Sequence, residues 1–221
     1  MSRSEYDLER PENYDVLVPL VIPYWEAFYE TVAGYIPTDS RRVLELGSGT
    51  GILTAMIRER IPTCDMVCLD SNPGMLAIAQ KKPVLQGVTF FERDIREKWP
   101  EGPFHAVVTT QCLFSFSKTE RAHIVGEAYR HLSDGGVFVN GDVFHPGEPW
   151  EFAFYCRRLR DFICTNGLSE EVAEMMLAPL EPMVRDYTPA SLCSLLRAQG
   201  FSISANPYKN ELYGIVLGIR Q

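Results

Sequence analysis

Three glycines at alternate positions form the part of this sequence best suited to bind a ligand. Gly47, Gly49 and Gly51 follow directly on the hydrophobic segment 42–46 and precede a segment with helical spacing. Glycines at a turn from a strand to a helix let the backbone approach a ligand without obstruction by Cβ atoms. In a parallel sheet, this turn lies beside the carboxyl ends of the strands, where ligands bind. We therefore expect a ligand site at this turn, with Ser48 as part of it.

Three acidic residues near these glycines indicate a ligand that is cationic and carries hydroxyl groups, rather than a dinucleotide. A dinucleotide site usually has its third glycine where this sequence has Ile52. Glu45, two residues before the first glycine, would repel a pyrophosphate but suits a cation. Asp70 ends the second predicted strand, where a carboxylate can accept both hydrogen bonds of a ribose diol. Asp94 follows the third predicted strand and could accept a hydrogen bond from an adenine amino group.

Two residues near the fifth predicted strand are candidates for catalysis. Segment 140–145 follows that strand at the same edge as the glycines, and His145 is the best candidate there for a general base. The other three histidines fall at the opposite edge or in or near a crossover helix. Asp142 could orient a substrate or cap a turn, and His145 could equally be an ordinary loop histidine.

The first 40 residues are rich in aromatic side chains and predict a helical region ahead of the first strand. This region could simply pack on the sheet, or it could form a lid over the ligand. An aromatic ring near a cationic ligand gives cation–π stabilisation, and a closed lid excludes water. Tyr14, Tyr24 and Trp25 are the candidates for that contact.

The elements that must position these residues alternate between short β-branched runs and segments with helical spacing, which is typical of a parallel sheet with crossover helices. We expect strands at 42–46, 66–70, 88–91, 105–110 and 136–140, helices at 53–60, 75–82, 119–132 and 192–199, a long helical stretch at 150–177, and a hairpin of 201–206 with 212–219. The predicted fold is α/β and Rossmann-like, with a seven-stranded, mostly parallel sheet and an antiparallel C-terminal hairpin. We expect one domain, 1–221, with an N-terminal helical lid at 1–40 and a helical insertion at 145–186.

Composition supports a single ordinary globular domain and argues against nucleic acid as a partner. The chain has 221 residues, with 21 Lys and Arg against 29 Asp and Glu, which gives a net charge of -8. Six scattered cysteines and a charged start predict a cytoplasmic protein with reduced thiols. No apolar run approaches the ~18 residues of a membrane helix, so we expect no membrane partner. Cys64 and Cys68 lack the second ligand pair of a zinc site, and we expect no metal.

The segments LELGSGTG, CLDSNPGM, ERDI and VVTTQCLF, in this order and spacing, resemble the ligand-binding motifs of class I S-adenosylmethionine-dependent methyltransferases. The resemblance implies S-adenosyl-L-methionine as cofactor, S-adenosyl-L-homocysteine as product and a small-molecule acceptor, and it is compatible with a homodimer. It also implies roles for individual residues: Glu45 at the methionine end, Gly47, Gly49 and Gly51 facing the ligand, Asp70 on the ribose, Ser71 and Met75 flanking the adenosine, Asp94 with Ile95 at the adenine, and Thr110 with Gln111 lining the methyl donor.

A narrower resemblance covers almost the whole chain. Asp15 followed by Pro23, together with QCLFSFSKTERAHIVGEAYRHLSDGG, DFICTNGLSEE and SLLRAQGF, is similar to the carboxy-S-adenosyl-methionine synthases that serve wobble-uridine modification in tRNA. Those enzymes need an arginine on the inserted helix for the extra carboxylate, and here that position falls on Leu177, with Arg185 as the nearest arginine downstream. The sequence therefore predicts a methyltransferase acting on a small molecule. The alternatives are such a synthase and a non-catalytic S-adenosylmethionine-binding module.

Overall fold

A seven-stranded sheet runs through the centre of the protein, whose structure is a computed structural model that describes residues 6–8 and 10–221. The strand order is β3-β2-β1-β4-β5-β7-β6. The first five strands pair in parallel, and β7 pairs antiparallel with both β5 and β6. The strands are β1 (Arg42–Leu46), β2 (Asp65–Asp70), β3 (Thr89–Glu92), β4 (Phe104–Thr110), β5 (Leu132–Val143), β6 (Ile203–Asn210) and β7 (Tyr213–Ile219). The predicted fold class is confirmed.

The strand order reverses direction at β1, and this places the glycine turn in the middle of the sheet. From β1 the chain adds β2 and β3 on one side and then crosses to add β4 and β5 on the other. Leu46 lies beside both Leu69 and Thr109 in the register. The residues that follow these three strands therefore meet at one edge, which is the usual ligand position in an open α/β sheet.

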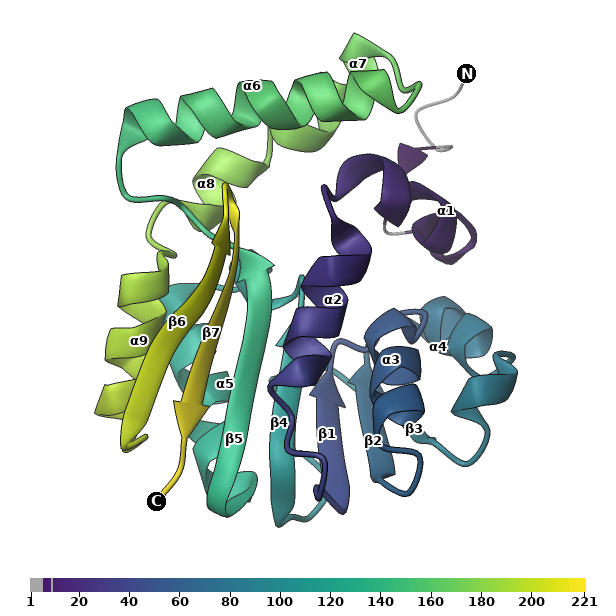
Figure 1. Cartoon of the computed structure of the whole chain (residues 1–221), viewed down its shortest axis with the longest axis vertical. Helices are drawn as coiled ribbons and strands as arrows, with labels where there is room; N and C mark the ends of the chain where they lie inside the picture. The colour runs from purple at the N-terminus through teal and green to yellow at the C-terminus, as the bar shows by residue number, and fades with distance from the viewer. Residues whose placement is uncertain (1–5, 9) are drawn as a thin grey trace.

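Helices cover both faces of the sheet. Figure 1 shows α2 (Trp25–Gly34) and α3 (Ile52–Arg60) on the near face and α5 (Lys118–His131) on the far face. The remaining segments between strands are α4 (Pro73–Ala79), α9 (Pro189–Ala198) and the short 3₁₀ turns η2 (Pro83–Leu85) and η3 (Leu113–Ser115). Helix α4 starts two residues earlier than predicted because the Asn72 side chain caps it and Pro73 occupies its first turn. It also ends three residues early, and Pro83 then begins η2.

The first helix and the helices of the insertion gather at the end of the sheet where the parallel strands finish (Figure 1). These helices are α1 (Pro11–Val21), α6 (Pro149–Thr165), α7 (Glu170–Leu177) and α8 (Leu180–Val184). The predicted stretch 150–177 is broken because Gly167 has a φ of 93° and Ser169 caps a new helix. Asn166 at the end of α6 donates a hydrogen bond of 3.2 Å to the Leu20 carbonyl of α1. The part of the expected lid at residues 1–5 and 9 lies outside the described residues.

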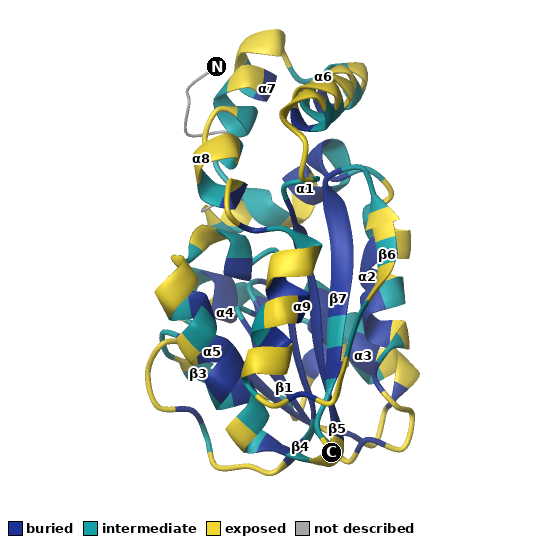
Figure 2. Cartoon of the chain, turned by 90° about the vertical axis from the view of Figure 1, so that its left-hand side faces the viewer, coloured by how far each residue is buried: buried dark blue, intermediate teal, exposed yellow. Residues whose placement is uncertain are grey.

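The fifth strand is longer than predicted, and this changes the setting of Asp142. Strand β5 runs to Val143 because β7 pairs with it from Val137 to Val143. Asp142 therefore lies inside the strand and is fully buried, whereas the sequence pattern placed it after the strand. Figure 2 shows the contrast between buried strands such as β7 and the many exposed residues of α6 and α7.

Candidate functional site

The glycine turn has a backbone conformation that favours glycine at all three positions. Gly47, Gly49 and Gly51 have φ values of 65°, 55° and 80°, in the left-handed region that costs other residues about 1–2 kcal/mol. The N–H groups of Gly47 and Ser48 donate to the Leu69 carbonyl at 2.8 and 3.1 Å, which ties the turn to β2. A Cβ atom on Gly49 would have no heavy atom within 4 Å. The backbone at Gly49 is therefore open to a ligand.

Asp70 holds this turn from the end of β2. Its Oδ2 accepts a hydrogen bond of 2.7 Å from the Gly49 N–H, and its Oδ1 accepts one of 2.8 Å from the Asn72 N–H. Burial raises the pKa of the Asp70 carboxyl, and these two N–H groups oppose that rise. Ser71 beside it is exposed, and Met75 is buried on α4. These two hydrogen bonds fix the Asp70 carboxylate at the edge of the sheet and connect it to the loops that follow β1 and β2.

Glu45 lies beneath the glycine turn instead of projecting from it. Its side chain is buried in the central strand, and Thr54 Oγ1 of α3 donates a hydrogen bond of 2.6 Å to its Oε2. Burial raises the pKa of Glu45 to about 8. A cationic group that reached this carboxylate would relieve the cost of ionising it.

Asp94 follows β3 and already has a partner. The Arg96 guanidinium donates to both of its oxygens, and Arg96 also pairs with Glu120 of α5. The hydrogen bonds from Arg96 hold the pKa of Asp94 below its usual range. Ile95 is buried, and its carbonyl accepts a hydrogen bond of 2.7 Å from Trp99 Nε1. An adenine amino group would have to share the Asp94 carboxylate with Arg96.

The loop after β4 packs closely against the glycine turn, with Cys112 next to Gly47. A Cβ atom on Gly47 would lie 2.7 Å from Cys112 Sγ. Gln111 has a φ of 50°, which is uncommon for a residue with a side chain, and its N–H donates to the Gly141 carbonyl at 2.9 Å. Thr110 is buried at the end of β4. This loop therefore has a specific backbone shape next to the glycine turn.

Buried polar atoms at the ends of β1 and β4 fit a polar ligand at this edge. Ser48 Oγ, Thr109 Oγ1 and Gln111 Nε2 are buried. The two hydroxyls bond with the thiols of Cys68 and Cys112, whereas Gln111 Nε2 has no hydrogen-bond partner among the described residues. Such atoms are normally satisfied by hydrogen bonds. Together with the open Gly49 backbone and the Asp70 carboxylate, these groups suit a ligand that carries hydroxyl, amino and carboxylate groups, as S-adenosylmethionine does.

Asp142 is linked to this site through the backbone of the loop after β4, and its charge also acts on the Cys112 thiol of that loop. Its Oδ2 accepts hydrogen bonds of 3.0 Å from the Phe114 N–H and 3.1 Å from the Tyr187 hydroxyl. Asn140 Nδ2 donates to the same hydroxyl at 2.9 Å, and the Arg121 guanidinium lies over the Tyr187 ring. Burial raises the pKa of Asp142 to about 7. Sequence reasoning missed Tyr187, which belongs to no recognised motif, and gave no role to Arg121, although Arg121 lies within the segment 111–136 quoted for the narrower resemblance.

We expect Tyr187→Phe to raise the pKa of Asp142 further, because the variant lacks a hydrogen bond that favours the ionised carboxylate. The free energy of unfolding should fall by about 1–2 kcal/mol at pH 8. At pH 5, where Asp142 is protonated, the loss should be smaller. Urea unfolding at the two pH values measures it, and Tyr35→Phe, at a half-buried tyrosine outside this network, is the control. Equal losses at both pH values would contradict the prediction.

His145 lies in a different environment from Asp142. Its ring stacks on Phe152 of α6 at 5.1 Å between centroids, and its Nδ1 accepts a hydrogen bond of 3.1 Å from the Gly147 N–H. It lines a cavity formed with α9 and β6, and no residue of the glycine turn lines that cavity. The structure does not bring His145 together with the other predicted site residues.

The predicted lid aromatics divide into one that lies at the glycine edge and two that lie elsewhere. The Tyr14 hydroxyl bonds with that of Tyr29, which in turn bonds with Thr110. Burial raises the pKa of Tyr14, and the nearby negative charge of Asp70 adds to the rise. Trp25 packs edge-on against Tyr29 at 6.4 Å, and Tyr24 is 74% exposed.

Helix α1 is also attached directly to the glycine turn. Thr50 Oγ1 donates a hydrogen bond of 2.5 Å to Asp15 Oδ1, and Lys82 Nζ lies 2.8 Å from Asp15 Oδ2. A Cβ atom on Gly74 would lie 2.6 Å from Pro11 of α1. The first helix therefore rests on the ligand edge, held by a carboxylate whose partners lie 35 and 67 residues further along the chain.

The close contact at Gly47 gives a test of the geometry of the turn. We expect Gly47→Ala to lower the free energy of unfolding by about 2 kcal/mol, because the new methyl group would overlap Cys112 and the backbone is left-handed. Gly49→Ala is the matched control, with the same backbone penalty and no overlap, and should cost about 1 kcal/mol. Urea unfolding compares them. Adding Cys112→Ala should bring Gly47→Ala close to Gly49→Ala, and an unchanged difference would exclude the overlap as its cause.

Within the described ranges, no group of three or more His, Cys, Asp or Glu residues is arranged to hold a metal ion. No helix in those ranges combines the length and apolar character needed to cross a membrane.

Comparisons with known proteins agree with this geometry. The profile of a family described as a methyltransferase domain matches residues 43–136. The demethylmenaquinone methyltransferase of Thermus thermophilus is 34% identical over 171 residues, which cover 74% of this chain and 75% of the relative. The carboxy-S-adenosyl-L-methionine synthase of Geobacter metallireducens is 28% identical over 167 residues, 72% of this chain and 68% of that protein.

The fold is shared with a solved O-methyltransferase family protein from Burkholderia thailandensis. The TM-score is 0.70 at 17% identity, and the match covers 96% of this chain and 59% of that one. This likeness concerns the fold alone, because the sequence identity is low. The chain spans under two thirds of the length of that protein.

Proposed function

This chain belongs to the class I S-adenosylmethionine-dependent methyltransferases, and from that membership we propose that it methylates a small-molecule acceptor bound beneath the helices at the glycine edge. We name residues 47–51, Asp70 and residues 110–112 the donor site. The observation that carries the proposal is the open backbone of Gly49, held in place by Asp70 at 2.7 Å. The Thermus relative is named for demethylmenaquinone, which favours an acceptor with an apolar ring.

When bound, S-adenosylmethionine supplies a methyl group on a sulfonium, and a nucleophile aligned with that bond can accept it. The chain's own contribution is orientation and exclusion of water. Asp70 and the glycine turn would hold the ribose and the amino-acid end, and Tyr14 on α1 would cover the site. We propose Asp142 as a positioning residue, because it holds the loop after β4 through the Phe114 N–H. A role for His145 as general base stays a prediction.

Two measurements test the assignment. The mass of the ligand retained on purification should correspond to S-adenosylmethionine or S-adenosylhomocysteine, and a nicotinamide dinucleotide would overturn the proposal. With the correct acceptor, the chain should then produce one S-adenosylhomocysteine for each methylated product. Demethylmenaquinone analogues with short side chains are the first acceptors to test. If the chain binds the donor but does not convert it with any acceptor, it is a binding module and not an enzyme.

Carboxylation of the cofactor is the second candidate function, favoured by the Geobacter relative. In this chain the position expected to carry the carboxylate-binding arginine is Leu177, the last residue of α7. It lines a small cavity with Arg160, which already pairs with Glu174 at 3.1 Å. We therefore expect no carboxylated product when the chain is incubated with S-adenosylmethionine and prephenate. Detection of that product by mass spectrometry would favour the synthase instead.

A further inference from the structure

We propose that the cavity between α9, the β6–β7 hairpin and the segment after β5 binds a small molecule that has an apolar body and an anionic group. The cavity measures about 570 Å³, within the range of roughly 300–1,000 Å³ that is typical of small-molecule sites. None of its lining residues belongs to the donor site. The cavity is therefore separate from the donor site, and the inference concerns a ligand other than S-adenosylmethionine.

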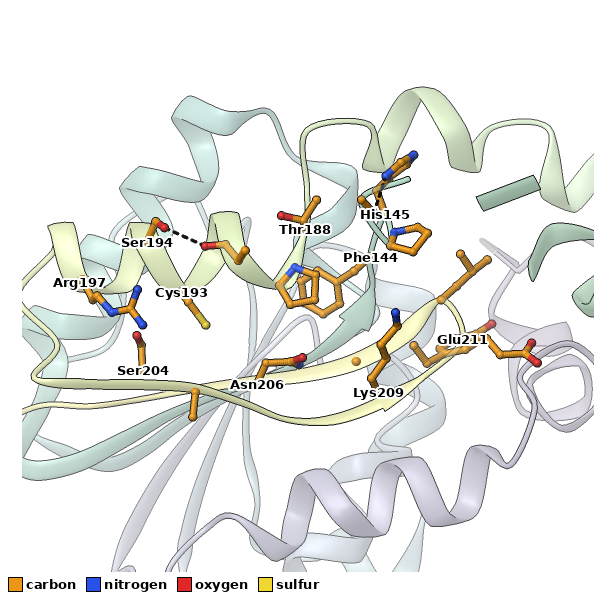
Figure 3. Close-up of a pocket in the computed structure, with 18 residues that line it drawn as sticks. Phe144, His145, Thr188, Cys193, Ser194, Arg197, Ser204, Asn206, Lys209 and Glu211 are labelled. Carbon is orange, nitrogen blue, oxygen red and sulfur yellow. Dashed lines mark hydrogen bonds between the residues drawn. The ribbon is translucent and has the colours of Figure 1, made fainter. Parts of the chain in front are cut away.

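The charge of the lining favours an anion. Figure 3 shows Arg197 of α9 and Lys209 of β6 at this cavity, with Lys209 directed into it. Within the described part of the chain, neither side chain forms an ion pair or donates a hydrogen bond to a carboxylate. The carboxylate that lines the cavity, Glu211, is bound by Arg158. The Lys209 ammonium lies over the Tyr155 ring of α6, 5.8 Å from the ring centre. No carboxylate pairs with either cation among the described residues, although the whole chain carries a net charge of -8.

The walls favour an apolar body for the ligand. Phe144, Pro189 and Leu212 line the cavity, and Phe144 is fixed by stacking on Tyr187 at 4.6 Å between ring centroids. Ser204 lies close to Arg197 in Figure 3. Its hydroxyl is buried beside the Cys193 thiol and has no oxygen or nitrogen partner in the described ranges. It bonds with that thiol and keeps capacity for a second hydrogen bond, which a polar atom of a ligand could use.

These groups identify the chemical class of the ligand. The Arg197 guanidinium on α9 can bind a carboxylate or a phosphate through two parallel hydrogen bonds, and Lys209 on β6 offers a second cation as a point charge. Both anions satisfy the same recognition chemistry. An aromatic acid, or a phosphate ester of similar size, would place its ring against Phe144 and Pro189 and its anionic group against one of the two cations, which lie at different ends of the cavity in Figure 3.

Calorimetry with the whole chain tests the proposal with three probes of one ring system: 1-naphthoate, 1-naphthyl phosphate and the neutral 1-naphthalenemethanol. We expect at least one of the two anions to bind saturably, about tenfold more tightly than the alcohol. At least one of Arg197→Gln and Lys209→Gln should weaken the binding of that anion about tenfold, and both should leave the binding of the alcohol unchanged. Both positions are exposed, so the variants should fold. Arg41→Gln, at an exposed arginine outside the cavity, should bind like the parent chain.

S-adenosylhomocysteine distinguishes this site from the donor site. It should not compete with the anion, and Asp70→Asn should lose S-adenosylhomocysteine binding without losing the anion. Whichever anion binds more tightly shows whether the site prefers a carboxylate or a phosphate. The proposal is overturned if neither anion binds, if the two cation variants bind as tightly as Arg41→Gln, or if S-adenosylhomocysteine displaces the anion.

Discussion

Replacing Glu45 by glutamine should raise the free energy of unfolding of the ligand-free chain by roughly 4 kcal/mol at pH 9. Burial raises the pKa of this carboxyl from 4.5 to about 8 in the folded state. Above that pH the folded chain holds an ionised carboxylate at a position that is 1% exposed. Glutamine removes the charge and keeps an oxygen that can accept the hydrogen bond from Thr54.

The direction of the pH dependence follows from proton binding. Between about pH 4.5 and pH 8 the native state keeps the proton of Glu45 while the unfolded state has lost it. The free energy of unfolding therefore falls as the pH rises through this window, and below it the parent chain and Glu45→Gln should be equally stable. Asp142, whose pKa burial raises to about 7, adds a fall of the same sign that persists in the variant.

Urea unfolding at pH 4.5, 7 and 9 measures the effect. Glu59→Gln is the matched control, because Glu59 is an exposed glutamate on the neighbouring helix α3 and should show no such pH dependence. The same substitution at Glu45 should weaken S-adenosylhomocysteine binding, if the carboxylate faces the ammonium of the ligand. A Glu45→Gln chain that is less stable than the parent at pH 9 would refute the burial argument.

Asp70→Asn should weaken S-adenosylhomocysteine binding more than 100-fold, about 3 kcal/mol. One carboxylate oxygen becomes an amide nitrogen, which cannot accept a hydrogen bond from the Gly49 or Asn72 N–H. The turn then loses part of its support, and a ribose diol loses one of its two acceptors. Both losses act on the same ligand, which is why the expected effect is large.

Strand β2 provides its own control for this experiment. Asp65 begins the strand that Asp70 ends, and it pairs with Arg42 at 3.1 Å on the surface, at the opposite edge of the sheet. Asp65→Asn should therefore bind S-adenosylhomocysteine like the parent chain. Calorimetric titration measures the affinity of both variants for S-adenosylhomocysteine. Equal affinities of Asp70→Asn and Asp65→Asn would show that Asp70 is not part of the binding site.

The positions of Glu45 and Asp142 show where sequence reasoning stopped. Glu45 lies near the carboxyl end of a predicted strand and Asp142 was predicted to follow one, so the pattern alone suggested side chains available to a ligand. Glu45 instead bonds with Thr54 of α3, and Asp142 is covered because β7 extends the pairing of β5. A strand pattern in the sequence predicts which side chains point to the same face of the sheet. How deeply a side chain is buried depends on which distant elements pack over it.

What the sequence determined by itself is the order of strands and helices, the glycine turn after β1 and the family. These features rest on local properties: β-branched runs, capping residues and glycines that tolerate a positive φ. Tertiary structure alone decided which residues meet at the turn. Asp15 reaches Thr50, and Tyr187 reaches Asp142 across 45 residues. Such contacts depend on the packing of α1 and of the insertion, and no short stretch of sequence encodes that packing.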